Sequence, residues 1–237
     1  MIRRALDIVV SSLALAVSAP LLLLAMAAIR LESRGPAIYR QRRVGRGGTR
    51  FEVYKLRTMI DGAERVGAGL RVNAGDERIT RVGAWLRRGS LDELPNLFNV
   101  LRGEMSLIGP RPTLPEQVAQ YTARQRGRLA VKPGITGWAQ VNGRASLPWA
   151  ERIELDLYYV EHRSLALDLR ILLRTPAMIP AAPASTRATP ADGRASCEPG
   201  RARAGIPERA YPSGHRQAGR QAGGVPGGAA DGGGQAL

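Results

Sequence analysis

Residues 8–29 read IVVSSLALAVSAPLLLLAMAAI, a run of 22 residues without a charged side chain. As a straight helix this run would reach about 33 Å, enough to cross a hydrocarbon core of about 30 Å. Pro20 interrupts it, because proline removes a backbone donor and clashes with the preceding turn, whereas the Ser18 hydroxyl can bond to the freed carbonyls. The pieces on either side would reach only about 18 and 14 Å, so neither crosses a membrane alone.

Basic residues flank this run on both sides. Arg3 and Arg4 precede it, and five arginines follow within residues 30–43. Because basic residues favour the cytoplasmic side, a re-entrant hairpin that returns to the same face accommodates both flanks. A kinked membrane span remains an alternative, and so does a signal peptide, since residues 25–27 (AMA) resemble a cleavage site. We expect residues 1–30 to form a re-entrant membrane segment, with the following domain on the cytoplasmic face.

Charge and composition divide the rest of the chain. The 237 residues carry a net charge of +15, of which residues 177–237 hold +3 and the preceding part holds +12. Those last residues contain 12 of the 28 glycines and 7 of the 16 prolines, so we expect a disordered tail, although an unselected extension would have the same composition. A single cysteine excludes an intramolecular disulfide, and two distant histidines argue against a His-rich zinc site.

Residues 31–176 predict a mixed α/β catalytic domain in which helix dominates. Two extended stretches flank GRGGT, a sequence typical of a β-hairpin turn. Helical periodicity appears in residues 80–88, 115–129, 149–162 and 165–175. In the first of these, Trp85 lies close to Arg87 and Arg88, which suits an interfacial amphipathic helix, but a core-facing helix with a basic rim explains the pattern as well.

Residues 90–112, SLDELPNLFNVLRGEMSLIGPRP, place Asp92 and Glu93 side by side among arginines. Ser90 followed by Glu93 spells a capping box, so both acids could merely complement a helix start. Pro95 complicates that interpretation, because as the fifth helical residue it would forfeit a bond that the helix interior needs. Carboxylates also bind Mg²⁺ and attack phosphorus, while Arg and Lys neutralise phosphate oxygens. Phosphoryl transfer is therefore a candidate activity.

Taken in order, these motifs resemble the bacterial sugar transferase family, in particular its small monotopic phosphoglycosyl transferases. The resemblance runs from about residue 4 to residue 175. The matching stretches are Asp7, the Pro-broken apolar run, residues 33–36 (SRGP), Gln41-x-Arg43-x-Gly45, residues 55–59 (KLRTM), Asp76-x-Arg78-Ile79-Thr80, residues 90–95 (SLDELP), residues 109–112 (GPRP) and residues 138–144 (WAQVNGR).

The resemblance implies a two-step transfer of a sugar phosphate from a nucleotide sugar, usually a UDP-sugar, to polyprenyl (undecaprenyl) phosphate in the bacterial cytoplasmic membrane, with release of UMP. Such a reaction begins glycan or exopolysaccharide synthesis, and downstream glycosyltransferases would be possible partners. Asp92 would be the nucleophile, Glu93 its partner in the acidic pair, and Mg²⁺ would sit at Asp92 and the diphosphate. The residues implied to bind phosphate oxygens or the nucleotide are Lys55, Arg57, Arg111 and Arg144.

Three other functions compete with this one. The basic domain could bind nucleic acid at a membrane, but aromatic residues make up only 5% of the chain and no nucleic-acid module is recognisable, so we expect no nucleic-acid partner. A membrane-anchored scaffold would need the acid pair only as a helix cap. A lipid-linked transferase of another kind would form no covalent intermediate.

Overall fold

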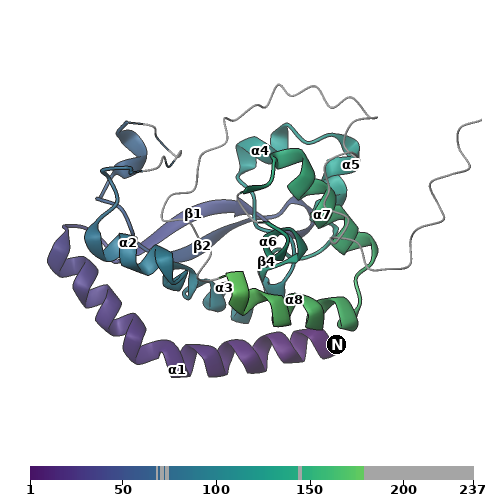
Figure 1. The fold of residues 1–237 in the computed structure, drawn as a ribbon, viewed down its shortest axis with the longest axis horizontal. Helices are drawn as coiled ribbons and strands as arrows, with labels where there is room; N and C mark the ends of the chain where they lie inside the picture. The colour runs from purple at the N-terminus through teal and green to yellow at the C-terminus, as the bar shows by residue number, and fades with distance from the viewer. Residues whose placement is uncertain (68, 70–71, 73–74, 144–145, 179–237) are drawn as a thin grey trace, which may run out of the picture. The chain divides into compact units, whose positions relative to one another are not determined.

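The computed structural model describes residues 1–67, 69, 72, 75–143 and 146–178. Nearly all of the expected disordered tail, residues 177–237, lies outside the described residues, and so does Arg144. The helices are α1 (Ile2–Glu32), α2 (Arg81–Arg88), α3 (Asn96–Arg102), α4 (Pro115–Ala119), α5 (Ala123–Arg126), α6 (Trp138–Val141), α7 (Trp149–Glu161) and α8 (Leu165–Met178). The strands are β1 (Ile38–Val44), β2 (Arg50–Leu56), β3 (Ser106–Ile108) and β4 (Gly134–Thr136). The mixed, helix-dominated fold predicted from the sequence is confirmed (Figure 1).

The apolar run forms one continuous helix, α1, with Pro20 inside it. Figure 1 shows that α1 changes direction partway along its length. The Ser18 hydroxyl donates to the Ala14 carbonyl, one turn before Ser18, at 2.6 Å. It does not bond to the Ala16 carbonyl, which is the one that Pro20 leaves without a donor. Among the described helices, α1 alone is long and apolar enough to cross a membrane. The re-entrant topology remains a prediction.

One stripe of α1 packs against the domain, and the rest of its surface is apolar and exposed. Asp7, Ser11, Ala25 and Ile29 are buried, at spacings that place them on one helical face. The most exposed apolar side chains within the run are Val9, Leu13, Val17, Leu23 and Leu24, each at least 64% exposed. A helix in a soluble domain rarely leaves so large an apolar surface uncovered.

The start of α1 is tied to the domain by polar contacts. Arg4 donates to the carbonyls of Val100 and Leu101, at 2.5 and 2.7 Å, where α3 ends. The buried Asp7 carboxylate accepts from the Ser106 hydroxyl at 2.9 Å and from the Leu107 amide at 2.9 Å. These contacts fix the first two turns of α1 on α3 and β3.

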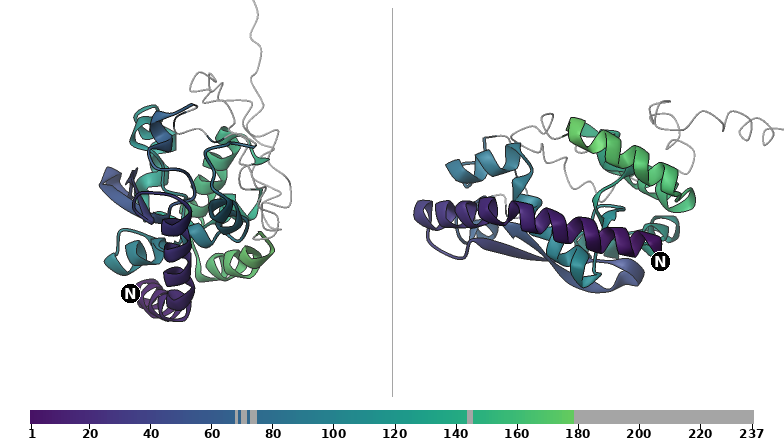
Figure 2. Two further views of the ribbon diagram at one scale, coloured as in Figure 1. Left: turned by 90° about the vertical axis from the view of Figure 1, so that its left-hand side faces the viewer. Right: turned by 90° about the horizontal axis from the view of Figure 1, so that it is seen from below.

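The end of α1 is tied to the same domain at a different place. The Glu32 carboxylate accepts from the backbone amides of Arg81 and Val82, at 2.8 and 3.0 Å, and so caps the N-terminus of α2. Ile29 packs in a buried cluster with Leu56 of β2 and Leu86 of α2. Both ends of α1 therefore rest on one folded unit (Figure 2).

The predicted β-hairpin is present. β1 and β2 pair antiparallel from Ile38 opposite Leu56 to Val44 opposite Arg50. Gly47 and Gly48 in the connection have φ values of 66° and 84°, a left-handed conformation that glycine adopts without a steric penalty. The hairpin carries Lys55 at the end of β2, close to the turn that contains Glu93.

The helical predictions are confirmed at α2, α7 and α8, but residues 115–129 do not form a single helix. They divide into α4, α5 and a 3-10 turn, because Thr122 starts a new helix with a capping box: Thr122 Oγ1 accepts from the Gln125 amide, and the Gln125 side chain accepts from the Thr122 amide. α3 and the short parallel pair of β3 and β4 had no periodic signal in the sequence.

Two glycines bring β3 and β4 unusually close at their ends. A Cβ on Gly109 would lie 2.4 Å from the Lys132 carbonyl oxygen, and one on Gly134 would lie 2.1 Å from the Gly109 amide nitrogen. No side chain fits at that distance. The GPRP loop (residues 109–112) and the KPGITG loop (residues 132–137) are thereby held together, and strands β3 and β4 pack beside the hairpin.

Candidate functional site

The acid pair lies on a short 3-10 turn, Leu91–Glu93, and not in a capped α-helix. Ser90 adopts a left-handed conformation with φ of 53°, and its side chain caps nothing. Pro95 is the N-cap residue of α3, so it stands before that helix and not within it. The capping-box interpretation is therefore wrong. A residue other than glycine held at positive φ is strained, which is common where side chains are positioned for function.

Glu93 is held by two cations. Lys55 Nζ lies 2.9 Å and Arg111 Nη2 lies 2.5 Å from the same Glu93 carboxylate oxygen, Oε1. Burial alone would raise the pKa of Glu93, but the charges of Arg111 and Lys55 outweigh it and hold that pKa well below its usual range. Burial lowers the pKa of Lys55, and the charge of Glu93 opposes that change. Glu93 is thus a fixed, ionised anchor for Lys55 and Arg111.

Asp92 has the opposite environment. Within the part of the chain that the structure describes, its carboxylate forms no hydrogen bond and no ion pair. Burial, followed by the neighbouring charge of Glu93, raises the pKa of Asp92 above its ordinary value, although Lys55 and Arg87 act in the other direction. The sequence could not distinguish the two acids, but the structure leaves one carboxylate free to react.

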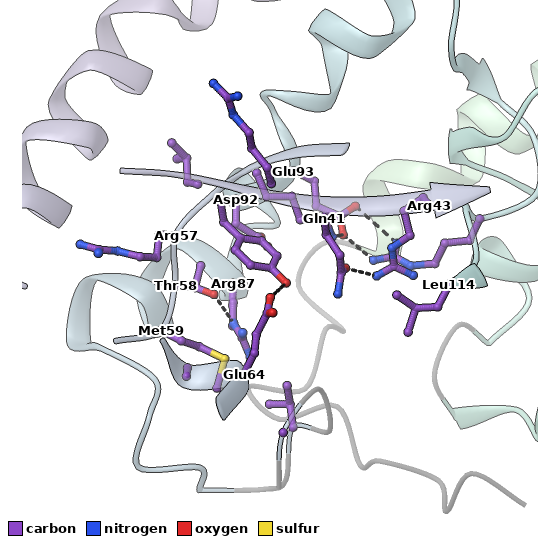
Figure 3. A pocket seen from close by; sticks show the side chains of 18 of the residues that line it. Gln41, Arg43, Arg57, Thr58, Met59, Glu64, Arg87, Asp92, Glu93 and Leu114 are labelled. Atoms are coloured by element: carbon purple, nitrogen blue, oxygen red, sulfur yellow. Dashed lines mark hydrogen bonds and ion pairs between the residues drawn. The ribbon is translucent and has the colours of Figure 1, made fainter. Parts of the chain in front are cut away.

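Both acids line a pocket of about 720 Å³, whose size suits a nucleotide-sized ligand (Figure 3). Basic side chains outnumber acidic ones in its wall. The basic residues are Arg40, Arg43, Lys55, Arg57, Arg65, Arg87, Arg111, Arg128 and Arg152. The acidic residues are Asp61, Glu64, Asp92, Glu93 and Asp156. This excess of positive charge favours an anionic ligand.

Arg57 is placed differently from the other predicted phosphate ligands. Its guanidinium donates to the Ser33 carbonyl at 2.8 Å, to the Ser33 hydroxyl at 3.0 Å and to the Arg34 carbonyl. Figure 3 shows the side chain pointing away from Asp92. A Cβ on Gly35 would lie 2.3 Å from Arg57 Nη1, so glycine is needed for this approach. The Arg57 Nη1 and Nη2 groups thus hold the chain that leaves α1, while Nε is buried without a partner among the described residues. Phosphate binding by Arg57 stays a prediction.

The structure adds two arginines to the site. Arg87 of α2 donates from Nε to the Thr58 hydroxyl at 2.8 Å and lies near Asp92. Arg43 of β1 donates to the Pro112 carbonyl at 3.1 Å and to the Gln41 side chain at 2.5 Å. Their signals were visible in the sequence: Arg87 precedes the acid pair by five residues, and Arg43 belongs to the Gln41-x-Arg43-x-Gly45 stretch.

Arg128 is a buried side chain that positions Arg111. It donates to the Arg111 carbonyl at 3.0 Å, to the Thr113 hydroxyl at 2.8 Å and to the Asp156 carboxylate at 2.7 Å. The Arg128 side chain is 5% exposed and that of Asp156 is 2% exposed. Because ion pairs in such surroundings lose little strength to solvent screening, Arg128 holds the backbone of the GPRP loop firmly.

The described residues could bind Mg²⁺ only through one carboxylate together with the phosphates of a substrate. The described chain has no cluster of three or more His, Cys, Asp or Glu side chains that could enclose a metal ion. Mg²⁺ is commonly held by one or two carboxylates together with the phosphates of a substrate, and it keeps several waters. The free Asp92 carboxylate suits that mode, whereas the Glu93 oxygens already bind Lys55 and Arg111.

A family model described as bacterial sugar transferase matches residues 1–181. A relative from Caulobacter vibrioides, named UDP-glucose:undecaprenyl-phosphate glucose-1-phosphate transferase, is 48% identical over 73% of this chain and 67% of its own length. An uncharacterized sugar transferase, EpsL, from Bacillus subtilis is 41% identical over 73% of this chain and 85% of its own length. An undecaprenyl-phosphate glucose phosphotransferase from Komagataeibacter xylinus is 45% identical over 73% of this chain, which spans only 35% of that protein.

Proposed function

Because the chain belongs to the bacterial sugar transferase family, we propose that it transfers a sugar 1-phosphate from a UDP-sugar to undecaprenyl phosphate and releases UMP. The two relatives from Caulobacter vibrioides and Komagataeibacter xylinus are named for undecaprenyl phosphate, and the first is also named for a UDP-sugar. The scaffold alternative is wrong, since the family is one of transferases. The basic pocket supports an anionic donor of nucleotide size.

The observation that carries the proposal is the free Asp92 carboxylate beside the paired Glu93. In the first step an Asp92 oxygen attacks the sugar-bearing phosphorus, and the bond from that phosphorus to the bridging oxygen breaks, so UMP leaves with the electron pair. In the second step an oxygen of undecaprenyl phosphate attacks the same phosphorus. The bond to Asp92 breaks, the carboxylate is restored, and a lipid diphosphate sugar results.

Cations must offset the repulsion between Asp92 and the donor. A carboxylate that approaches a diphosphate of charge about −2 is opposed by several kcal/mol at an effective dielectric constant of about 20. Arg111 and Lys55 are already fixed near the acid pair by Glu93, and Arg87 lies near Asp92. Mg²⁺ bound by Asp92 and the phosphates would supply further charge neutralisation.

The anchoring of α1 supports a monotopic enzyme. A spanning helix would place Arg4 and Glu32 on opposite sides of the membrane, yet both side chains bond to the same folded unit. If the apolar middle of α1 enters one leaflet and returns, both contacts can form. The lipid then covers the exposed apolar side chains of α1. We place the domain at the cytoplasmic face, where the pocket would lie at the depth of the lipid phosphate.

Purified protein in detergent tests this function. UDP-sugars are supplied singly with undecaprenyl phosphate, and release of UMP is measured with and without the lipid. We expect UMP release with at least one donor, complete loss of activity with excess EDTA, and a sugar-phosphate adduct on the protein when the lipid is omitted. Turnover without an adduct would favour the competing transferase that forms no covalent intermediate. The absence of UMP release with every UDP-sugar would reject the proposal.

A further inference from the structure

The side-chain amide of Gln140 is buried and makes no hydrogen bond within the described part of the chain. It lies on α6, it is only 5% exposed, and it lines the pocket. Neither its amide oxygen nor its amide nitrogen has a hydrogen-bond partner among the described residues. Burying a donor and an acceptor without partners costs folding free energy. A side chain that is kept at such a cost in a pocket wall is expected to bind a ligand.

A second unused acceptor lies on α7. One oxygen of Asp156 pairs with Arg128, whereas the other oxygen, Oδ1, is buried and has no partner in the part of the chain that the structure describes. Trp149 stands seven residues before Asp156, two turns earlier on the same helical face, and both line the pocket. The guanidinium groups of Arg128 and Arg152 lie over the Trp149 ring, and Leu114 adds apolar surface to the pocket wall.

Arg111 links these groups to the acid pair. Its side chain reaches Glu93, and its backbone carbonyl accepts from Arg128, which pairs with Asp156. Asp156 therefore lies beyond Arg111, one of the cations that would hold the phosphates. Gln140 belongs to α6, which packs against the helix that carries Asp156, α7. In an in-line displacement the leaving group departs on the side opposite the attacking oxygen. For a donor attacked by Asp92, that leaving group is the nucleotide.

We propose that Gln140, Asp156 and Trp149 form the subsite for the nucleoside of the donor, an inference that rests on the proposed function. An amide presents a donor beside an acceptor, as does the imide edge of a pyrimidine such as uracil, so the two can pair through two hydrogen bonds. A ribose hydroxyl can donate to Asp156 Oδ1. The flat apolar faces of the base suit contact with Trp149 and Leu114.

Gln140→Met separates this role from a structural one. Methionine has nearly the same length and no groups that need hydrogen bonds, so we expect thermal stability equal to or above that of the wild type. The affinity for UMP, measured by calorimetry with the full chain, should fall about tenfold or more, and kcat/KM for the UDP-sugar should fall by a similar factor. Gln120→Met is the matched control, because Gln120 is exposed at the end of α4 and does not line the pocket.

Three outcomes would overturn the inference. UMP affinity that is unchanged in Gln140→Met while kcat/KM falls would mean that Gln140 binds the sugar. Unchanged values of both quantities would mean that it binds no substrate. A loss of UMP affinity that is matched by an equal loss of affinity for pyrophosphate would place Gln140 at the phosphates. If the wild type transfers no sugar phosphate but binds UMP through Gln140, the proposed function fails and the subsite stands.

Discussion

At the residue scale, the two neighbouring carboxylates have opposite environments. Glu93 is held by Lys55 and Arg111, and its pKa is low because their charges outweigh the effect of burial. Asp92 has no such partner among the described residues, and burial raises its pKa. A nucleophile must have a free oxygen, whereas a positioning group must be fixed. The proposed mechanism therefore makes Asp92 the nucleophile and Glu93 the positioning group.

Asp92→Asn should abolish covalent labelling and lower turnover at least about 10³-fold, because a neutral amide is not a nucleophile. The raised pKa means that folding disfavours the ionised form of Asp92, so at neutral pH the amide should leave the melting temperature unchanged or raise it by up to about 3 °C. Differential scanning calorimetry beside the labelling assay checks both. A large loss of stability would show that Asp92 supports the fold.

The rate of covalent labelling should fall as pH decreases through the pKa of Asp92. Because that pKa is raised, the midpoint of this acid limb should lie above the ordinary aspartate value of about 3.9. Glu93, whose pKa is low, stays ionised over the same range and adds no second limb. Rapid-quench labelling from pH 3 to pH 8 measures the midpoint, with thermal stability followed in parallel. A midpoint at or below the ordinary value contradicts the assigned environment of Asp92.

At the element scale, α1 is a structural part of the domain. Arg57 joins α1 to the rest of the domain, since its guanidinium binds the Ser33 and Arg34 carbonyls that follow α1. Arg57→Met should therefore cost about 2–3 kcal/mol of stability and lower the melting temperature by roughly 4–12 °C. The KM for the UDP-sugar should change little. Arg88→Met, at an exposed position of α2, is the control. Normal stability with a strongly raised KM would support phosphate binding by Arg57.

Many of the helices and strands could be predicted from the sequence. The hairpin follows from GRGGT between extended stretches, and α2, α7 and α8 follow from their apolar periodicity. α3 was missed because seven residues are too few for a periodic signal, and β3 and β4 because three-residue strands have none.

The side-chain network could not be predicted from sequence patterns. Asp7 meets Ser106 from 99 residues away, and Lys55 meets Glu93 from 38 residues away. Local patterns do not encode such pairs. The resemblance identified the acid pair, Lys55 and Arg111 as site residues, but only the folded chain shows which carboxylate is paired. It also shows that Arg57 supports α1, a role that its place in the KLRTM stretch did not suggest.

At the scale of the whole molecule, the placement of α1 sets the relation to the membrane. Ile2 and Leu31, near its two ends, are both exposed. Single cysteines at these positions, with Cys197 replaced by serine, should both react with an impermeant maleimide in inside-out vesicles and not in intact cells. A cysteine at Leu23, in the apolar middle, should be protected in both. Reaction of the two ends from opposite sides would show that α1 spans the membrane.

The central claim is that a sugar phosphate is carried on the Asp92 carboxyl group between two half-reactions. Mass spectrometry of protein quenched after incubation with a UDP-sugar, without lipid, tests it most directly. The account predicts that the peptide containing Asp92 gains the mass of one sugar phosphate, and that added undecaprenyl phosphate removes it. Product formation while that peptide keeps its unmodified mass would contradict the account.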